Sequence, residues 1–598
     1  MRQVVEIIPA SAAHDAIYPQ VFSSDHQDGP AIAYLNDLGT RKLVEFFEAK
    51  GLLALKEEDR NEQWYNDWAA YQAKHQLYAR LLAPQAYSKL GSQLDLLRLT
   101  RFLEVFGYFS PAHGYSLQVT FLGLFPILMG SNSALKQEAV AALEAGAMFA
   151  LGVSEKEHGS DLFGNEFTVT QIAPGRLIAR GSKYYIGNSN CAAIISILAR
   201  KVDQPVNGRV KRAPFVVFAL RPQQSSGFKD NRKIRTLGVR AAFVGGFEVK
   251  DHELPETDLI AEGRDAWDAI FGTVTLGKFF LGFGSIGICE HALVEAANHM
   301  RRRTLFGKPV IEMPHVRLAT AQAYTRLTAM KLYAYRALDY VQAATSDDRR
   351  YLLFMAVQKA KVSTEGVKVM ALLSECIGAK SFESDTYFEM ALRDAQLIPG
   401  LEGSTHINLA FAAQFIPRYF VRGGSAANLQ PPPSLVTGEQ PPAENPYLME
   451  ARAGAVHSVT FPGFLDAYRP LRTVANVRRF ITQVKAFALF MRGGRYKLAA
   501  EAGTPMALAV GQTLATIAYG QLIAENASRM GIAPQMVSAI FHLLVTDLST
   551  SALALASLPR LGAVGRALVR QMMVIPRTTA ADWEFVAQRI AGSGEQAL

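Results

Sequence analysis

Apolar residues recur every three or four positions over much of the chain, which is the spacing of one face of an α-helix. The first such region runs from about residue 31 to residue 149. It contains segments such as LDLLRLTRFLEVFGYF and ALKQEAVAALEAGAMFAL. This spacing predicts a helical N-terminal domain over residues 31–149.

The pattern changes near Leu151, where short runs rich in β-branched residues are separated by Gly, Pro and Asn. EFTVTQIA, RLIARGSKYYIG, AAIISILARK, FVVFAL and GGFEVKDHEL are segments of this kind. Such runs are typical of β-strands. We therefore expect a middle β domain over residues 150–262.

Long helical periods return after the β domain and predict a helical bundle over residues 263–422. The next stretch, GGSAANLQPPPSLVTGEQPPAENPY, is dense in Pro, Gly and polar residues, which is typical of a linker. We place the linker at 423–454 and a helical C-terminal extension at 455–598. The predicted fold class is therefore mainly α with a central β domain.

Composition narrows the class of protein further. Of the 598 residues, 49% are hydrophobic and 19% are charged, which is enough to fill packed cores and excludes a disordered chain. The three cysteines are far apart and none lies in a C-x-x-C pair, so a disulfide framework and a Cys-based zinc site are not expected. Few cysteines and no apparent secretory signal favour a reducing, cytoplasmic location.

No run of about 18 apolar residues is free of charge, and the nearest, Phe279 to Cys289, is too short to span a bilayer. The net charge of +9 is modest for this length and does not indicate nucleic-acid binding. Residues 455–598 hold 14 Lys or Arg against 7 Asp or Glu, so +7 of the excess lies in the extension.

Two hypotheses suit this basic extension. Its helices carry abundant Ala and Gly, which suit close packing and favour a role in completing a homodimer. The alternative is peripheral contact with an anionic membrane, because Arg478, Lys485 and Arg492 line one face of a predicted helix.

The sequence lacks the motifs of several common classes of enzyme. The sequence has no G-x-x-x-x-G-K-[ST] phosphate loop, no H-E-x-x-H zinc helix and no G-x-S-x-G elbow. The glycines of LGFGSIG, residues 281–287, lie inside a helical run, so they indicate close helix packing rather than a dinucleotide loop.

Four local features remain, and each has a plain structural alternative. VSEKEHGSD (153–161) suits backbone contacts to a ligand, or a capped turn, and KYYIGN (183–188) suits stacking on a flat ring, or a core strand. RRRTLFGK (301–308) suits phosphate binding, or a cationic helix end. LRDA (392–395) followed by LEGSTHI (401–407) suits a carboxylate base in a tight pocket, or a helix N-terminal acid.

In this order, on a helix–β–helix pattern, the four features resemble the acyl-CoA dehydrogenase family. The resemblance runs from about residue 30 to 422 and includes TLGVRAAFVGGFEVKDHELPETDLI, RRRTLFGKPV and RDAQLIPGLEGSTHI. It implies a helical N-domain, a β-barrel-like middle domain and a four-helix-bundle domain. The further C-terminal helices resemble the enlarged, very-long-chain branch.

The resemblance implies FAD as cofactor, with no metal, and α,β-dehydrogenation of an acyl-CoA thioester to the trans-2-enoyl product. Glu402 matches the family's E-G-T/S base. A desolvated carboxylate has a raised pKa and is a stronger base toward the weakly acidic α-proton. The resemblance further implies that hydride leaves the β carbon for flavin N5 and that hydrogen bonds to the thioester carbonyl stabilise the developing charge. The resemblance assigns one of these bonds to the backbone N–H of Glu402.

The remaining site residues follow from the same match. Ser160, Lys278 and Gly403 correspond to substrate contacts. The expected contacts to FAD are Val153, Ser154, Tyr185, Gly187, Arg303, Phe306, Ser404 and His406.

The sequence departs from the usual family pattern at several of these positions. Gly187 replaces a Thr whose hydroxyl approaches the flavin, and His406 replaces a frequent Gln. Pro314 stands where a Gln often meets the adenine side of FAD, and Glu157-His158 makes the first motif bulkier and more charged. Arg303 and Phe306 correspond to an R-x-x-F-G element that reaches FAD across a dimer interface.

The leading functional hypothesis is a dehydrogenase that passes electrons to an electron-transfer flavoprotein. One alternative is an acyl-CoA oxidase that uses O₂. A second is a dehydrogenase of acyl chains bound to an acyl carrier protein. A third is a helical scaffold that has the fold but no catalytic activity. The presence of Glu402 argues against this alternative.

Overall fold

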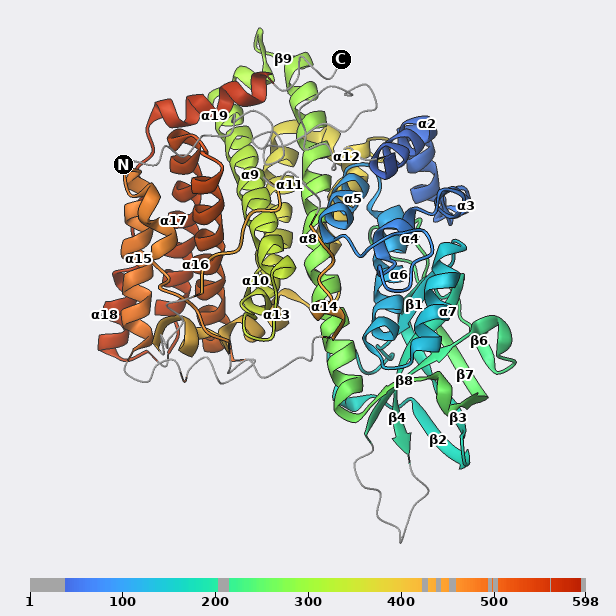
Figure 1. Cartoon of the computed structure of the whole chain (residues 1–598). Helices are drawn as coiled ribbons and strands as arrows, with labels where there is room; N and C mark the ends of the chain where they lie inside the picture. The colour runs from blue at the N-terminus through green and yellow to red at the C-terminus, as the bar shows by residue number, and fades with distance from the viewer. Residues whose placement is uncertain are drawn as a thin grey trace, which may run out of the picture.

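Helices make up most of the fold, with one sheet set at the end of a helical body (Figure 1). The computed structural model describes residues 38–202, 214–421, 429–436, 442–450, 459–492, 497, 504–559 and 561–592. Residues 31–37 of the predicted N-terminal domain lie outside this part of the chain, as do residues 423–428, 437–441 and 451–454 of the predicted linker. The predicted fold class, mainly α with a central sheet, is confirmed.

The N-terminal region consists of helices that pack around one buried helix, α6. Nearly every residue of α6 is buried, as its continuous apolar sequence requires. Side-chain caps define some of the starts: Asp95 accepts a hydrogen bond from the N–H of Arg98, and Asn132 accepts from the N–H of Ala134. The helices are α2 (Leu38–Asn61), α3 (Asn66–His75), α4 (Leu77–Leu82), α5 (Leu96–Phe109), α6 (Pro111–Met129) and α7 (Ser133–Glu144).

The middle region folds as one eight-stranded sheet. Its strands follow the order β6-β7-β3-β2-β4-β5-β8, and β1 pairs with β4 in parallel. The long pairing of β3 with β7 is antiparallel and carries two register shifts, so it is bent along its length. The strands are β1 (Met148–Gly152), β2 (Thr168–Ala173), β3 (Arg176–Gly187), β4 (Ala192–Val202), β5 (Phe215–Leu220), β6 (Phe228–Asp230), β7 (Val244–Pro255) and β8 (Leu259–Glu262).

A 40-residue helix, α8 (Gly263–Arg302), starts directly after the sheet and runs the length of the body (Figure 1). It packs against α5 so closely that a Cβ on Gly287 would lie 1.9 Å from the carbonyl oxygen of Glu104. The prediction that the glycines of residues 281–287 serve close packing is thereby confirmed for Gly287, and also for Gly282, where a Cβ would lie 2.3 Å from the Gln358 amide.

The bundle around α8 contains one interruption that matters later, a π-helical turn at Gln358–Val362 between α10 and α11. A short hairpin, β9 (Thr304–Leu305) with β10 (Lys308–Pro309), follows α8. The other helices of this region are α9 (Pro314–Gln342), α10 (Tyr351–Val357), α11 (Ser363–Ile377), α12 (Tyr387–Leu397) and α13 (Thr405–Ala413).

The C-terminal extension packs against the bundle, mainly through α16 on α13 and α9, and through α19 and α17 on α9 (Figure 1). Buried ion pairs cross this contact: Arg336 of α9 lies 3.0 Å from Glu525 of α16, and Lys361 lies 3.4 Å from Asp547 of α17. The helices after the bundle are α14 (Tyr447–Glu450), α15 (Ala475–Met491), α16 (Pro505–Arg529), α17 (Pro534–Ala556), α18 (Ala563–Arg570) and α19 (Ala580–Gly592).

Three helices are long and apolar enough to cross a membrane when up to two charged residues are tolerated: α8, α16 and α17. The sequence expectation considered only uncharged runs and therefore did not select them. In the fold, 72%, 83% and 56% of their most apolar windows are buried, so most of this apolar surface packs against other parts of the protein.

Candidate active site

Glu402 lies in the turn between a 3₁₀ turn, Ile398–Gly400, and the start of α13. Its backbone is left-handed, with a φ of +48°, and Gly403 follows with a φ of +94°. A left-handed Glu is uncommon and costs free energy that the surroundings must supply. The amide of Asn408 donates to the carbonyl oxygens of Gly403 and Ser404, both at 3.0 Å, and ties this turn to the first turn of α13.

Three elements meet at the Glu402 carboxylate. The amide of Gln118, on α6, donates to Glu402 Oε1 at 2.9 Å and to the carbonyl oxygen of Gly277, on α8, at 2.8 Å. A Cβ on Gly277 would lie 2.7 Å from Glu402 Oε2, so this glycine makes room for the carboxylate. Oε2 itself is buried and accepts no hydrogen bond from the described residues.

Burial raises the pKa of Glu402 to about 7, against the opposing effects of the Gln118 hydrogen bond and two nearby lysines. The residue as a whole is half-buried, so it borders an accessible region although Oε2 is shielded. A carboxylate with a pKa near neutrality and one unpaired oxygen is suited to accept a proton.

The two lysines approach from different elements. Burial lowers the pKa of Lys278, on α8, to about 8, and its ammonium lies 5.5 Å from the centre of the Phe411 ring. Burial lowers the pKa of Lys359, in the π-helical turn, to about 7, and its ammonium donates to the carbonyl oxygen of Ile398 at 2.6 Å. Both lysines therefore flank the turn that carries Glu402.

Tyr115 connects this carboxylate to the end of β3. A Cβ on Gly187 would lie 2.7 Å from the Tyr115 ring and 2.7 Å from Val119, so a Thr at position 187 would collide with α6. Burial raises the pKa of the Tyr115 hydroxyl, and the charge of Glu402 adds to this effect. The end of β3 and the Glu402 turn thus flank the same stretch of α6.

The predicted cofactor residues of the β domain lie near this end of β3. Tyr185 is 60% exposed and has a φ of +62°, so its ring projects from the sheet. The Ser154 hydroxyl donates to the carbonyl oxygen of Tyr184 at 2.7 Å and joins the segment after β1 to β3. Val153 is buried beside it, while Ser160, farther along the same loop, is exposed.

A buried ion pair supports this loop. Lys183 of β3 lies 2.9 Å from Glu155 Oε1 and also donates to the carbonyl oxygen of Val153 at 3.1 Å. The carboxylate of Glu155 accepts two further hydrogen bonds from the backbone N–H groups of Glu166 and Phe167. The pair therefore holds both ends of the loop that contains the VSEKEHGSD motif.

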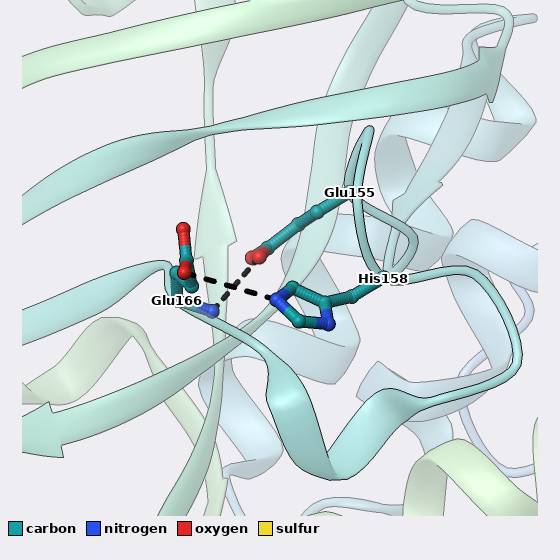
Figure 2. Close-up of side chains that lie close together, drawn as sticks. All are labelled: Glu155, His158 and Glu166. Carbon is teal, nitrogen blue, oxygen red and sulfur yellow. Dashed lines mark hydrogen bonds and ion pairs between the residues drawn. The ribbon is translucent and has the colours of Figure 1, made fainter.

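Glu155, His158 and Glu166 lie close enough together to suggest a metal site (Figure 2). The geometry gives another explanation, because both oxygens of Glu155 are already occupied by Lys183 and two backbone N–H groups. The His158 ring lies 3.8 Å from Glu166 Oε1 and is a weak contact at the loop surface. We assign no metal to these residues.

Two predicted cofactor residues lie far from Glu402 along the chain. Arg303 follows the end of α8, and Phe306 is 97% exposed at the tip of the β9–β10 hairpin with a φ of +53°. Lys278, beside Glu402, is 25 positions before Arg303 on α8, which is roughly 38 Å of helix. The structure does not bring these two residues to Glu402 within one chain.

The predicted residues after Glu402 share its turn. Gly403 supplies the second left-handed position, Ser404 precedes α13 without a side-chain cap, and His406 is exposed in the first turn of the helix. Sequence reasoning missed Gln118, Gly277 and Lys359. A single amide in the otherwise apolar middle of α6 was the one available signal for Gln118.

Comparison with known proteins agrees with this geometry. Residues 265–416 match the family model for the C-terminal domain of acyl-CoA dehydrogenases. The chain is 24% identical to an acyl-CoA dehydrogenase of Bacillus subtilis over 63% of this chain and 96% of that protein. It is also 24% identical to the cyclohex-1-ene-1-carbonyl-CoA dehydrogenase of Geobacter metallireducens, over 55% of this chain and 86% of that protein.

One solved structure extends the likeness to the whole chain. An acyl-CoA dehydrogenase from Bacillus anthracis, complexed with FAD, superposes with a TM-score of 0.70 at 16% identity and covers 98% of both chains. The likeness in fold therefore includes the C-terminal extension. The family model and these relatives support membership of this chain in the acyl-CoA dehydrogenase family, a class of flavin-dependent oxidoreductases.

Proposed function

We propose that this protein is an FAD-dependent acyl-CoA dehydrogenase in which Glu402 removes the α-proton of the acyl thioester. The observation that carries the proposal is the unpaired, buried Oε2 of Glu402, held where α6, α8 and the turn before α13 meet. Because the pKa of Glu402 is about 7, a substantial fraction of the carboxyl is ionised at neutral pH and can accept a proton. The protonated carboxyl is also stable in this buried position.

The hydrogen bond from Gln118 decides which carboxylate oxygen reacts. Because Oε1 is held by the Gln118 amide, the lone pairs of Oε2 are available to the substrate. Within the described residues, the backbone N–H of Glu402 also has no acceptor. It can therefore donate to the thioester carbonyl as negative charge develops there.

The residues of this chain fit a flavin at the same place. Tyr185 offers an exposed aromatic ring at the end of β3, and Ser154 with Val153 supplies the adjoining backbone. The unpaired Oε2 of Glu402 lies where α6 meets α8. When bound, FAD supplies the hydride acceptor for the substrate β carbon.

An absorbance spectrum followed by anaerobic titration with saturated acyl-CoAs of several lengths tests this function. The expected result is an oxidised-flavin spectrum that bleaches with at least one acyl-CoA. Protein that binds no added FAD, or that binds FAD without bleaching by any acyl thioester, would contradict the proposal. Titration with the same acyl groups on an acyl carrier protein separates that carrier from CoA.

We further propose that electrons leave to an electron-transfer flavoprotein. Turnover in air with that partner present should then give little hydrogen peroxide. Rapid peroxide formation would instead identify an oxidase.

We also propose that the protein acts as a homodimer. The exposed Phe306 and Arg303 are about 38 Å along α8 from the Lys278–Glu402 region, farther than one dinucleotide reaches. If both groups contact FAD, as the family resemblance implies, they contact different FAD molecules in two chains. Sedimentation equilibrium should show a dimer, and Phe306→Ala should reduce FAD affinity while leaving Glu402 in place.

A further inference from the structure

The π-helical turn at Gln358–Val362 carries two buried lysines with different partners. A π-helical turn shifts the facing of side chains relative to an α-helix and is frequent at functional sites. Lys361 lies 3.0 Å from Glu365 and 3.4 Å from Asp547, and its charge is thus balanced by two carboxylates. Lys359 has a different environment, because its ammonium donates to a neutral backbone carbonyl and has no ion pair among the described residues.

That carbonyl belongs to Ile398, four residues before Glu402. The Lys359 ammonium donates to it at 2.6 Å, and the N–H of Leu401 shares the same acceptor at 3.2 Å. Glu402 follows in its left-handed conformation. The bond from Lys359 therefore fixes the upstream end of a strained turn, and Asn408 fixes the downstream end.

Burying an ammonium against a neutral carbonyl is costly unless a negative charge lies near. The charged groups that face Lys359 are Glu402, whose charge favours the ammonium form, and Lys278, whose charge opposes it. Glu402 in turn faces Gln118, Lys359, Lys278 and the hydroxyl of Tyr115. Lys359 and Glu402 thus stabilise each other's ionised forms.

We propose that Lys359 is the positioning residue of the base: its ammonium holds the turn of Glu402 through the Ile398 carbonyl and supports the ionised carboxylate. The expected effect of Lys359 on the rate of flavin reduction rests on the proposed function. Its effect on the ionisation of Glu402 does not, because that is measured in the substrate-free protein.

The chain provides a matched control in Lys361. Both lysines are buried in the same π-helical turn, so Lys359→Met and Lys361→Met disturb the same element. Of these two lysines, Lys359 donates to the Ile398 carbonyl before Glu402, whereas the ammonium of Lys361 is paired with Glu365 and Asp547. Lys359→Gln is a gentler variant, because a neutral amide can still donate to Ile398 while the charge is lost, and Lys359→Arg restores both charge and donor.

The test is a titration of the Glu402 carboxyl in substrate-free holoenzyme by infrared difference spectroscopy, with Glu402→Gln identifying the band. We expect Lys359→Met and Lys359→Gln to raise the midpoint by about one pH unit, because a nearby positive charge is lost. Lys359→Arg should return it to within a few tenths of the wild-type value, and Lys361→Met should leave it unchanged.

A second readout measures the rate of flavin reduction against pH. Lys359→Met should lower the maximal rate about tenfold or more with little change in substrate affinity, since the base is displaced rather than the binding surface. An unchanged carboxyl midpoint in both Lys359→Met and Lys359→Gln would overturn the inference, as would an equal shift in Lys361→Met. If the wild-type flavin is not reduced by any acyl thioester, the proposed function fails while the infrared titration still decides the role of Lys359.

Discussion

Gln118, on α6 and 284 positions earlier in the chain, donates a hydrogen bond of 2.9 Å to Oε1 of Glu402, in the turn before α13. A hydrogen bond donated to a carboxylate stabilises its charged form and lowers its pKa. This bond therefore limits how far burial raises the pKa of Glu402, which lies at about 7.

Replacing Gln118 by Leu should shift the pH profile of flavin reduction to higher pH. The ionised base is the active form, so the rate rises as pH increases through the pKa, and losing the donor moves that rise upward. Reduction at pH 7 should fall while the plateau at high pH is retained. Gln483→Leu, which removes a buried amide in the extension, should leave the midpoint in place. If Gln118→Leu had the same pH profile of flavin reduction as the wild type, the hydrogen bond from Gln118 would not affect the pKa of Glu402.

Glu402→Gln should keep FAD and lose substrate-dependent bleaching. The amide is nearly the same shape as the carboxyl but cannot accept the α-proton, and general-base catalysis contributes about 10²–10⁴-fold. Stopped-flow reduction under anaerobic conditions measures the loss. Glu383→Gln, an exposed surface change, serves as the control. Bleaching at the normal rate in Glu402→Gln would remove this residue from the mechanism.

Gly277→Ala should impair the reaction through contact with the base. The new methyl would lie 2.7 Å from Glu402 Oε2 and 2.5 Å from Leu122 Cδ2, so the carboxylate must move. We expect the reduction rate to fall about tenfold or more.

Gly284→Ala is the matched change on the same helix, because a Cβ there meets nothing within 4 Å. It should retain the rate and raise the free energy of unfolding by up to about 1 kcal/mol through helix propensity. Equal rates in the two variants would contradict the steric role of Gly277.

Lys183→Met should destabilise the protein and reduce its FAD content. Leaving Glu155 buried without its cation costs about 3–5 kcal/mol. The loop that it supports includes Val153 and Ser154, which are proposed to contact FAD. Thermal unfolding and the ratio of flavin to protein measure the two effects. The exposed pair of Lys250 with Glu248 offers a control, since Lys250→Met should change stability by less than about 0.5 kcal/mol.

The sequence was sufficient for features that depend on local pattern. Three-to-four spacing located the helices, and the β-branched runs located the strands of the sheet. The LEGST motif singled out Glu402 as the candidate base, and the structure buries this carboxylate so that its pKa rises to about 7. These features depend on residues that are close together in the sequence, so they can be recognised without knowing how the elements pack.

The partners of Glu402 could not be predicted in the same way. Gln118, Gly277 and Lys359 lie 284, 125 and 43 positions away, and only the packing of α6, α8 and the π-helical turn brings them together. Gly277 looks like any other packing glycine on α8. Lys359 looks like a solvated lysine until the extra residue of the π-helical turn directs it to Ile398.

The ion pairs between bundle and extension bear on how the protein unfolds. Arg336 is fully buried between Asp339 and Glu525, and Lys361 depends partly on Asp547. Detaching the extension would remove Glu525 and Asp547 and leave these buried cations with fewer anionic partners. Bundle and extension should therefore lose structure in one cooperative calorimetric transition, whereas two separate peaks would show them to be energetically independent. The segment after the proline-rich stretch is tied to the bundle by these buried ion pairs, and we expect the two to unfold as a single thermodynamic unit.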